Sequence, residues 1–397
     1  MKERSPAPRS RSDGDSTSSR RSYGLRWPRK NCSILSEARN VMAGEPISHA
    51  PRRQACCSLD CMLGRVMLPC APRRVELCRC ALLLPAAFAV LIGSAIALDS
   101  RSQREKLLPR FEVGQVLAVS TGQPVALEQW LAGLASADVI YLGEEHHNPA
   151  HVRAAITVLE AILVRKNRAV LLMEMFGWDG QAALHRYRED PCYSRDAFLA
   201  DVGWDKNWGG AFEDYEPLVA FARQKSQVIT IALNPPRFLV RKVAKEGLVT
   251  ALADPEMDRW GVRDQPFVDD QSYRDLIIGQ LRRCHGGLDE EGYRRMYEAS
   301  LFRDEGMAKT VDDWLHQIGP LVSYTGGGHI QYGLPVPNRV LRRRATIGDP
   351  GVKQVTVYLH SFDPARQGEV QELLKEGIAD YLWLTSLSAH GAPRRCR

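Results

Sequence analysis

Five side chains have types and positions suited to acid–base chemistry. They lie in or just after short apolar runs, at Glu144, His146, Glu174, Arg237 and His329. A histidine beside a carboxylate can act as a general base, with the carboxylate orienting the imidazole. An arginine and a second histidine can then stabilise negative charge that develops on a substrate. These residue types support one hypothesis, a hydrolase in which His146 is the base.

Each of these residues also has a structural interpretation. The stretch from Glu144 to His147 could be a solvated loop, and His329 could cap a turn after three glycines. Glu174 stands inside an apolar run, where an unpaired charge is costly, and Arg237 could neutralise it. A divalent metal stays open only within the hydrolase hypothesis, because the helical HExxH spacing of a strong zinc motif is missing. No GxGxxG, Walker or GxSxG motif follows the strand-like runs.

The elements that must position these side chains are short strands. Six apolar runs alternate with helix-period stretches, at 139–143, 169–176, 228–233, 321–325, 354–360 and 380–385. This pattern predicts an α/β fold whose parallel sheet carries helices on both faces. Ligands of such sheets bind beyond the carboxyl ends of the strands, so we expect the candidate residues to meet at one rim. Asn148 should cap the first long helix, with Pro149 as its first residue.

Two connections are too long for a single helix. We expect them to form a small helical subdomain, at approximately 177–226 and 236–318, inserted in the crossovers of one domain that spans 99–390. The first connection contains Trp204 and Trp208. Two tryptophans so close together could pack at a subdomain junction, or they could offer a flat apolar surface to a planar ligand.

Charge is distributed unevenly along the 397 residues. The formal net charge is +6, but residues 1–80 carry 16 basic and 7 acidic side chains, or +9, and the remainder is at −3. The bulk of the chain is therefore mildly acidic, which argues against a nucleic-acid-binding protein. Seven of the ten cysteines also lie in 1–80, without the spacing or histidines of a zinc module.

Two different segments precede the predicted domain. Residues 1–79 are basic and without periodicity, which predicts disorder or an over-extended start ahead of Met62 or Met67. Residues 80–98 are uncharged and end in the small-x-small pattern of a signal peptide, with an uncleaved membrane anchor as the alternative. We therefore expect an exported protein that is periplasmic or attached to the membrane through 80–98.

Taken together, the motifs resemble the ChaN-like haem-binding proteins of the wider TIKI/TraB and erythromycin-esterase-like superfamily. The matching blocks are GEEHHNP at 143–149, LMEMF at 172–176, Trp208 through YEP at 215–217, ALNPPR at 232–237, CHGGL at 284–288, RDEGMA at 303–308, and GGGH at 326–329 with GLPVP at 333–337. Their order and spacing cover about residues 125–345.

The resemblance implies a parallel α/β domain with a small helical domain, export, and haem binding linked to iron acquisition. Haem sites of the family look like dimer-interface pockets with a tyrosine as the iron ligand, which makes a homodimer an expected partner. A phenolate suits ferric iron, and the candidates on the helical insert are Tyr273, Tyr293 and Tyr297. His285 could contact a propionate, or it could be a helix-end histidine with satisfied hydrogen bonds. Trp204, Trp208 and basic residues for the propionates would lie nearby. The chain departs from the family in lacking a lipobox cysteine.

Three hypotheses follow from the sequence. The first is an exported haem carrier that uses a tyrosine on the helical insert. The second is a hydrolase, an esterase or a metal-dependent peptidase, that uses the strand-end residues. The third is a membrane-tethered protein without a small ligand. Replacing His146 with alanine should abolish hydrolysis but spare haem binding, which separates the first two.

Overall fold

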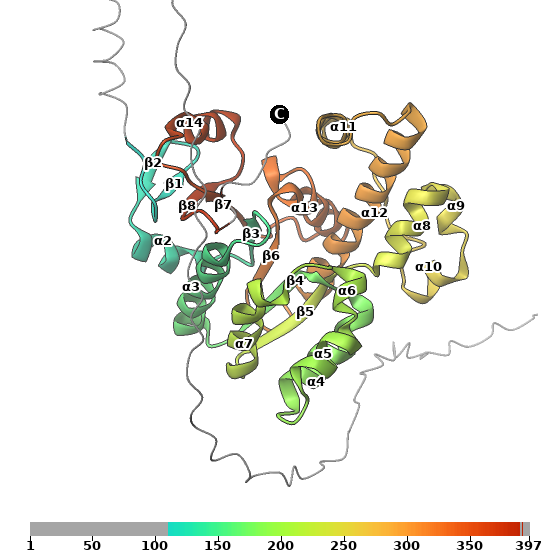
Figure 1. Cartoon of the computed structure of the whole chain (residues 1–397), viewed down its shortest axis with the longest axis horizontal. Coiled ribbons are helices and arrows are strands. Elements are labelled where there is room, and N and C mark those ends of the chain that lie inside the picture. Colours follow the sequence, from blue (N-terminus) through green and yellow to red (C-terminus); the bar gives the residue numbers. More distant parts are fainter. Residues whose placement is uncertain (1–109, 390, 392–397) are drawn as a thin grey trace, which may run out of the picture. The chain divides into compact units, whose positions relative to one another are not determined.

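The computed structural model describes residues 110–389 and residue 391. Eight strands form one sheet in the order β2-β1-β8-β7-β3-β6-β4-β5 (Figure 1). The strands are β1 (Val116–Ala118), β2 (Gln123–Val125), β3 (Val139–Glu144), β4 (Ala169–Gly177), β5 (Val228–Asn234), β6 (Leu321–Gly326), β7 (Gln354–Ser361) and β8 (Tyr381–Thr385). The six predicted strands are confirmed, and all neighbours from β8 to β5 pair in parallel. The antiparallel edge formed by β1 and β2 was not predicted, because each strand has only three residues.

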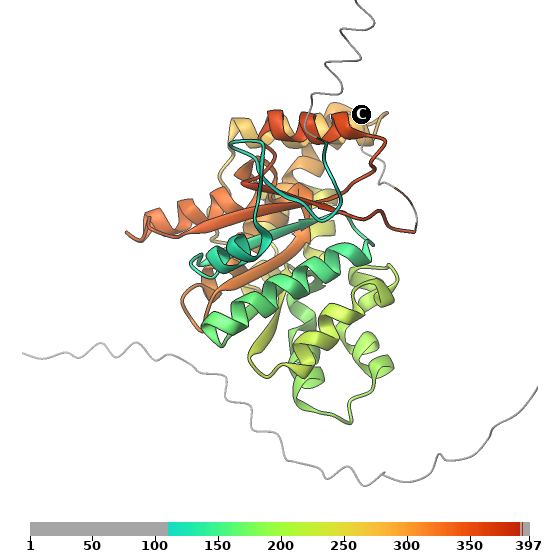
Figure 2. The ribbon, with the colours of Figure 1, turned by 90° about the vertical axis from the view of Figure 1, so that its left-hand side faces the viewer.

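Helices cover both faces of the sheet, as predicted. Ile140 and Leu142 of β3 point into one apolar cluster, whereas Val139 and Tyr141 point into another on the opposite face. The first face is covered by α2 (Leu127–Leu134), α3 (Pro149–Lys166), α4 (Gln181–Glu189), α5 (Arg195–Val202), α6 (Trp204–Asn207) and α7 (Glu216–Gln224). The second face is covered by α12 (Glu290–Trp314), α13 (Val336–Thr346) and α14 (Gln367–Glu376). Figure 2 shows these layers on either side of the sheet.

The start of α3 follows from local sequence. The Asn148 side chain accepts a hydrogen bond from the Ala150 N–H at 2.8 Å, and Pro149 is the first helical residue. Proline loses nothing there, because the first N–H groups of a helix have no partner within it. The predicted cap is confirmed, and it fixes where the chain turns after β3.

The crossover between β5 and β6 contributes further helices, which gather around α12. They are α8 (Arg237–Glu246), α9 (Leu248–Leu252), α10 (Pro255–Arg259) and α11 (Gln271–Cys284). The second half of α12 packs on the sheet through Met307 and Val311. Its first half packs on α8 to α10 through Phe302, and on α11 through Tyr297 and Leu301. Figure 1 shows α8 to α11 grouped around this first half. One helix thus connects the sheet with these smaller clusters.

The predicted basic segment 1–79 and the predicted signal or anchor at 80–98 lie outside the described residues. Within residues 110–389 and 391, no helix combines the length and the apolar character needed to cross a bilayer.

Candidate functional site

Glu174 lies at the centre of the strand-end cluster. It is 1% exposed, near the end of β4. Its Oε2 accepts hydrogen bonds from the Thr325 hydroxyl at 2.6 Å and from the Gly326 N–H at 2.5 Å, so the end of β6 holds one oxygen in place. Its Oε1 forms an ion pair with Arg303 of α12. The expectation that Arg237 neutralises Glu174 is wrong, because Arg303 does so.

The environment keeps Glu174 ionised. Burial by itself would raise the pKa of Glu174, but the charges of Arg303 and then of His329 hold it well below the ordinary value. Arg303 is positioned in turn by Asn234, whose Oδ1 accepts from its Nε at 3.1 Å. The Asn234 amide also donates to the main-chain carbonyl of Glu174 at 2.5 Å. Asn234 therefore joins the end of β5 to both members of the ion pair.

Glu144 orients His146. The carboxylate is 3% exposed at the end of β3, and its Oε1 lies 2.7 Å from Nδ1 of the imidazole. It also accepts hydrogen bonds from the hydroxyls of Tyr215, at 3.2 Å, and Tyr324, at 2.7 Å. The solvated-loop interpretation is therefore wrong for Glu144. The His146 side chain is 44% exposed, and its ring stands edge-on to Trp208 with centroids 4.8 Å apart.

His329 stands on the other side of Glu174. It lies in the short 3-10 helix η3 (Gly327–His329) after β6. Its Nδ1 is 2.5 Å from Oδ1 of Asp304 on α12, and its Nε2 is 3.5 Å from Oε1 of Glu174. Burial lowers the pKa of His329, but the negative charges of Glu174 and Asp304 outweigh it and raise the pKa to about 9. The imidazole is therefore protonated at neutral pH.

The two histidines have matching arrangements around one buried carboxylate. Each presents Nδ1 to a different acidic residue, Glu144 for His146 and Asp304 for His329. Burial opposes protonation of His146, but the Glu144 hydrogen bond and the charge of Glu174 raise its pKa. Because His146 is held through Nδ1, its Nε2 is left for proton transfer, the arrangement that general acid–base catalysis needs, whereas Nε2 of His329 faces Glu174.

Arg237 takes a different position from the one expected. It is the first residue of α8, is half-buried, and donates from Nη1 to the main-chain carbonyl of Lys206 at 3.0 Å. Burial first, and then the charges of Arg241 and Arg303, lower its pKa. Arg237 therefore belongs to a group of arginines at the rim.

The three candidate tyrosines are buried within the α11–α12 pair, each with its hydroxyl bonded. Tyr273 donates to Asp304 at 2.6 Å, and Tyr297 donates to Asp269 at 2.6 Å. Tyr293 donates to the main-chain carbonyl of His285 at 3.0 Å. The hydroxyls of Tyr273 and Tyr297 thus donate to carboxylates, whereas the hydroxyl of Tyr293 donates to an uncharged carbonyl.

His285 and His329 line the same cavity. It has a volume of about 250 Å³ and lies between α11, α12 and the turn after β6. Its lining residues are Ile277, Gln280, Leu281, Cys284, His285, Ser300, Asp304, Gly328 and His329. The cavity joins the helical insert to the strand-end cluster, because Asp304 and His329 belong to both.

The two tryptophans of the first crossover have different surroundings. Trp204 is 3% exposed, donates to the Gly210 carbonyl at 2.7 Å, and packs against Phe176 and Phe212. Trp208 is half-buried and contacts His146 at the rim. Both tryptophans pack against the apolar cluster on the first face of the sheet, and Trp208 in addition contacts an imidazole at the rim.

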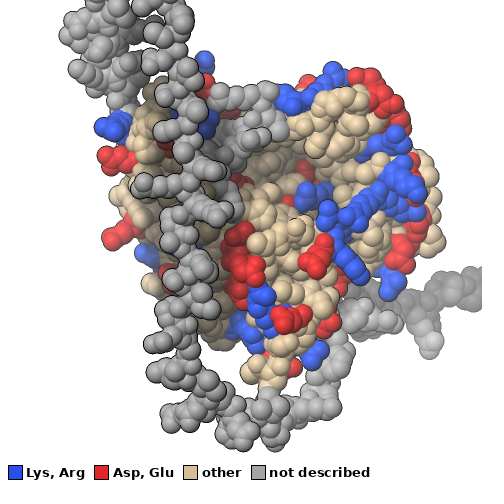
Figure 3. All heavy atoms as spheres, in the orientation of Figure 1, with Lys and Arg blue, Asp and Glu red and all other residues tan. Residues whose placement is uncertain are grey.

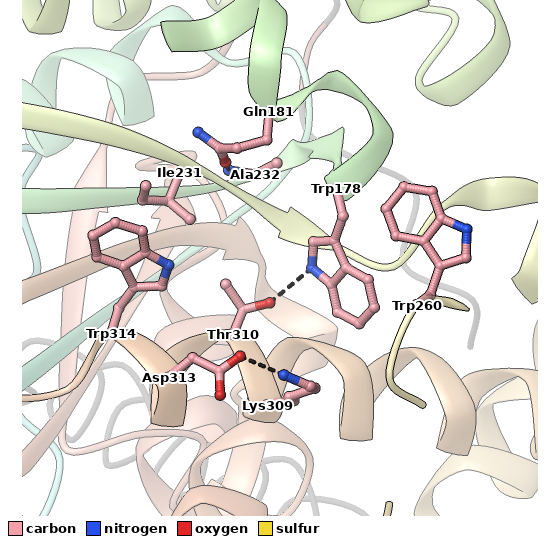
Figure 4. Close-up of a pocket in the computed structure, with 9 residues that line it drawn as sticks. All are labelled: Trp178, Gln181, Ile231, Ala232, Trp260, Lys309, Thr310, Asp313 and Trp314. Atoms are coloured by element: carbon pink, nitrogen blue, oxygen red, sulfur yellow. Dashed lines mark hydrogen bonds and ion pairs between the residues drawn. The ribbon is translucent and has the colours of Figure 1, made fainter. Parts of the chain in front are cut away.

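A second cavity, of about 290 Å³, lies beside the edge strand β5. Figure 4 shows Trp314 on one side of it and Trp178 with Trp260 on the other. Its charged residues, Lys309 and Asp313, pair with each other at 2.5 Å. This cavity shares no lining residue with the strand-end cluster.

Several members of the cluster were missed in the sequence. Arg303 and Asp304 lie in a predicted helix, and nothing in the sequence indicates that this helix reaches the strand ends. Tyr215 and Tyr324 stand among apolar residues, which is the pattern of core residues. Glu145 turns away from the rim, because its carboxylate accepts from the Ser361 N–H at 2.8 Å. Among residues 110–389 and 391, no set of three or more His, Cys, Asp or Glu side chains is arranged to hold a metal ion.

The chain is similar to a known family in sequence and to a solved member of that family in fold. The sequence model of a family described as haem-binding uptake, Tiki superfamily, ChaN matches residues 130–340. A solved structure of ChaN from Campylobacter jejuni, described as showing cofacial heme binding, superposes with a TM-score of 0.51 at 20% sequence identity. The match covers 68% of this chain and 95% of that chain. A mutant of the erythromycin esterase EreC in its open conformation matches with a TM-score of 0.35 at 12% identity, over 62% and 76%. No curated protein matches the sequence.

Proposed function

The chain belongs to the haem-binding uptake family of the Tiki superfamily that includes ChaN, and from this we propose that it binds haem and serves haem or iron acquisition. The observation that carries the proposal is the family match over 130–340, which spans more than half of the chain and includes the strand-end cluster and the α11–α12 pair. Haem is then the cofactor or cargo of a protein that presents aromatic and basic side chains at the ends of a parallel sheet.

The haem site of this proposal lies at the cavity between α11, α12 and His329, with a tyrosine as the ferric ligand. Tyr293 is the best of the three candidates. Burial raises the pKa of Tyr273 and of Tyr297, and Tyr273 also shares Asp304 with His329. The Tyr293 hydroxyl meets an uncharged carbonyl instead, and the Arg282 guanidinium lies 5.5 Å from its ring centroid.

The size of this cavity argues for an opening motion or a second copy of the chain. Its volume of about 250 Å³ is at or below the lower end of the range for small-molecule pockets, roughly 300–1,000 Å³, and haem is a large ligand. We propose that α11 moves away from α12, and that a homodimer completes the pocket. The Campylobacter jejuni protein is described as binding heme cofacially, an arrangement that two copies of this chain would also allow.

A hemin titration of the purified full-length chain tests the proposal. We expect a saturable Soret shift at about one haem per chain, with a high-spin ferric spectrum typical of tyrosinate ligation. Tyr293→Phe should remove the tyrosinate signature, whereas Tyr273→Phe and Tyr297→Phe should retain it. Absence of any saturable shift would refute haem binding. If the tyrosinate signature is lost in Tyr273→Phe or in Tyr297→Phe but kept in Tyr293→Phe, the tyrosine whose replacement removes it is the iron ligand and the assignment to Tyr293 is wrong.

A hydrolase is the second candidate, and the pairing of Glu144 with His146 favours it. The imidazole is oriented through Nδ1, and its side chain is exposed enough to meet a substrate. His146 would be the base and His329 would stabilise developing negative charge, with Glu174 holding both histidines electrostatically. His146→Ala should abolish the hydrolysis of an ester or peptide substrate and leave the hemin titration unchanged. Equal hydrolysis by the variant would refute this role.

We also propose that the protein is exported through residues 80–98. The support is the uncharged run and its small-x-small ending, together with membership of an uptake family. Expression of the full-length chain followed by fractionation and N-terminal sequencing tests this. A mature N-terminus near residue 98 in the periplasm indicates cleavage, and an intact chain in the membrane fraction indicates an anchor. An intact chain in the cytosol would contradict export.

A further inference from the structure

Two arginines at the rim have no acidic partner within the part of the chain that the structure describes. Arg237 is the first residue of α8, and Arg241 follows one turn later, so both lie on the same side of the helix. The only hydrogen bond of Arg237 among the described residues goes to a main-chain carbonyl, that of Lys206. The N-terminus of a helix carries a partial positive charge. The guanidinium of Arg237, the first residue of α8, adds its own positive charge at that end of the helix.

Other basic residues on α8 and α12 differ in this respect. Lys245 of α8 likewise has no acidic partner among the described residues, whereas two others are compensated. Lys242 contacts Asp254 at 2.8 Å, and Arg294 pairs with Glu291 at 2.6 Å. Figure 3 shows basic side chains gathered in a band on the α8 and α12 side of the face in view.

Arg303 connects the arginine pair with the strand-end cluster. It is close enough to Arg237 for its charge to lower the pKa of that guanidinium, although burial contributes more. It also pairs with Glu174, whose Oε1 is 3.5 Å from Nε2 of His329 at the cavity wall. A series of charge interactions therefore runs from the arginine pair through Arg303 and Glu174 to His329 at the cavity wall.

We propose that Arg237 and Arg241, backed by Arg303, form a carboxylate-binding site that takes the propionate groups of haem. This inference rests on the proposed haem function and names the groups of the haem molecule that the protein would recognise. Arg237 is half-buried and Arg241 is exposed. Their like charges repel one another, and an anion bound between them would relieve that repulsion. The planar guanidinium matches a carboxylate with two parallel hydrogen bonds, which an ammonium group cannot reproduce. The anchored propionates would orient the macrocycle toward the α11–α12 pair.

The test compares hemin with hemin dimethyl ester, which keeps the macrocycle and iron but lacks the propionate charges. Both are titrated into the full-length chain and into the double variant Arg237→Gln/Arg241→Gln. We expect the native chain to bind hemin about tenfold or more tightly than the ester, since hydrogen bonds between charged groups contribute more than neutral ones. The double variant should lose that preference by weakening hemin binding while leaving ester binding unchanged.

Two controls keep the test specific. Arg259→Gln removes an exposed arginine of α10 that pairs with Glu256, so it should keep the preference for hemin. Arg237→Lys keeps the charge but loses the planar fork, so it should lose part of the preference. Circular dichroism checks that each variant folds.

The outcomes are distinguishable. If neither hemin nor its ester binds to the native chain, the proposed haem function fails. If both bind equally well, or if the double variant keeps the preference for hemin, haem binding stands and the propionate site is refuted. Loss of the preference in Arg259→Gln would also refute it, because general surface charge would then explain the effect.

Discussion

Oδ1 of Asp304 lies 2.5 Å from Nδ1 of His329, so an acidic residue of the crossover helix α12 orients an imidazole at the end of β6. The same carboxylate accepts a hydrogen bond from Tyr273 of α11 at 2.6 Å. A chain of polar contacts thus runs from the helical insert to Glu174 in the sheet. It couples the proposed haem cavity to the strand-end cluster through a single buried side chain.

The first prediction concerns the pH dependence that this contact creates. The pKa of His329 is about 9 in the folded chain and 6.5 ordinarily. A pKa raised by folding adds stability that is complete below pH 6.5 and is lost as pH rises through about 9. An NMR titration of the imidazole should show the high pKa, and Asp304→Asn should lower it. An unshifted His329 in the native chain would contradict the ion pair.

Much of the rim could be predicted from the sequence. The run from Val139 to Gly143 is apolar without alternation, which is characteristic of a strand buried on both faces of a parallel sheet. Because the carboxyl ends of such strands share one edge, Glu144, Glu174 and His329 could be brought together without knowing the helices. The cap at Asn148 followed from local chemistry in the same way.

The partners supplied by the helices could not be predicted. Arg303 is 129 residues away from Glu174 in sequence, and nothing in a helix-period pattern says which residue reaches the sheet. Arg237 lay nearer in sequence and was a reasonable partner, but it begins α8 and points to Lys206 instead. Tyrosine burial was equally hidden, because an amphipathic helix does not reveal which neighbour covers it.

The second prediction concerns the ion pair between Glu174 and Arg303. Arg303→Met should leave the buried carboxylate without its cation and lower the free energy of unfolding by about 2 kcal/mol, less than for a fully buried pair because Arg303 is 30% exposed. Urea unfolding measures this. Adding Glu174→Gln should recover part of the loss, since the uncompensated charge is then removed. Arg259→Met, at an exposed pair, should stay within about 0.5 kcal/mol of the native chain.

The third prediction concerns Glu145, which joins β3 to β7. Burial would raise its pKa, but the hydrogen bond with His360 and the other polar contacts lower it to about 2 from 4.5. A lowered pKa adds stability that is present above pH 4.5 and is lost as pH falls toward about 2. Urea midpoints between pH 6 and pH 2.5 should therefore fall more steeply for the native chain than for Glu145→Gln. Equal slopes would show that this carboxylate has an ordinary pKa.

The fourth prediction concerns Gly326, which leaves room for His146. A Cβ atom there would lie 2.9 Å from Cε1 of His146 and 3.3 Å from Oε2 of Glu174. Gly326→Ala should therefore push the exposed imidazole away from Glu144 at a cost of about 1 kcal/mol or less in global stability. The loss of its carboxylate partner should lower the pKa of His146, which an NMR titration measures. Gly328→Ala is the matched control, because a Cβ atom at that glycine meets no heavy atom within 4 Å. An unchanged His146 pKa in Gly326→Ala would mean that the imidazole is not confined by the β6 backbone.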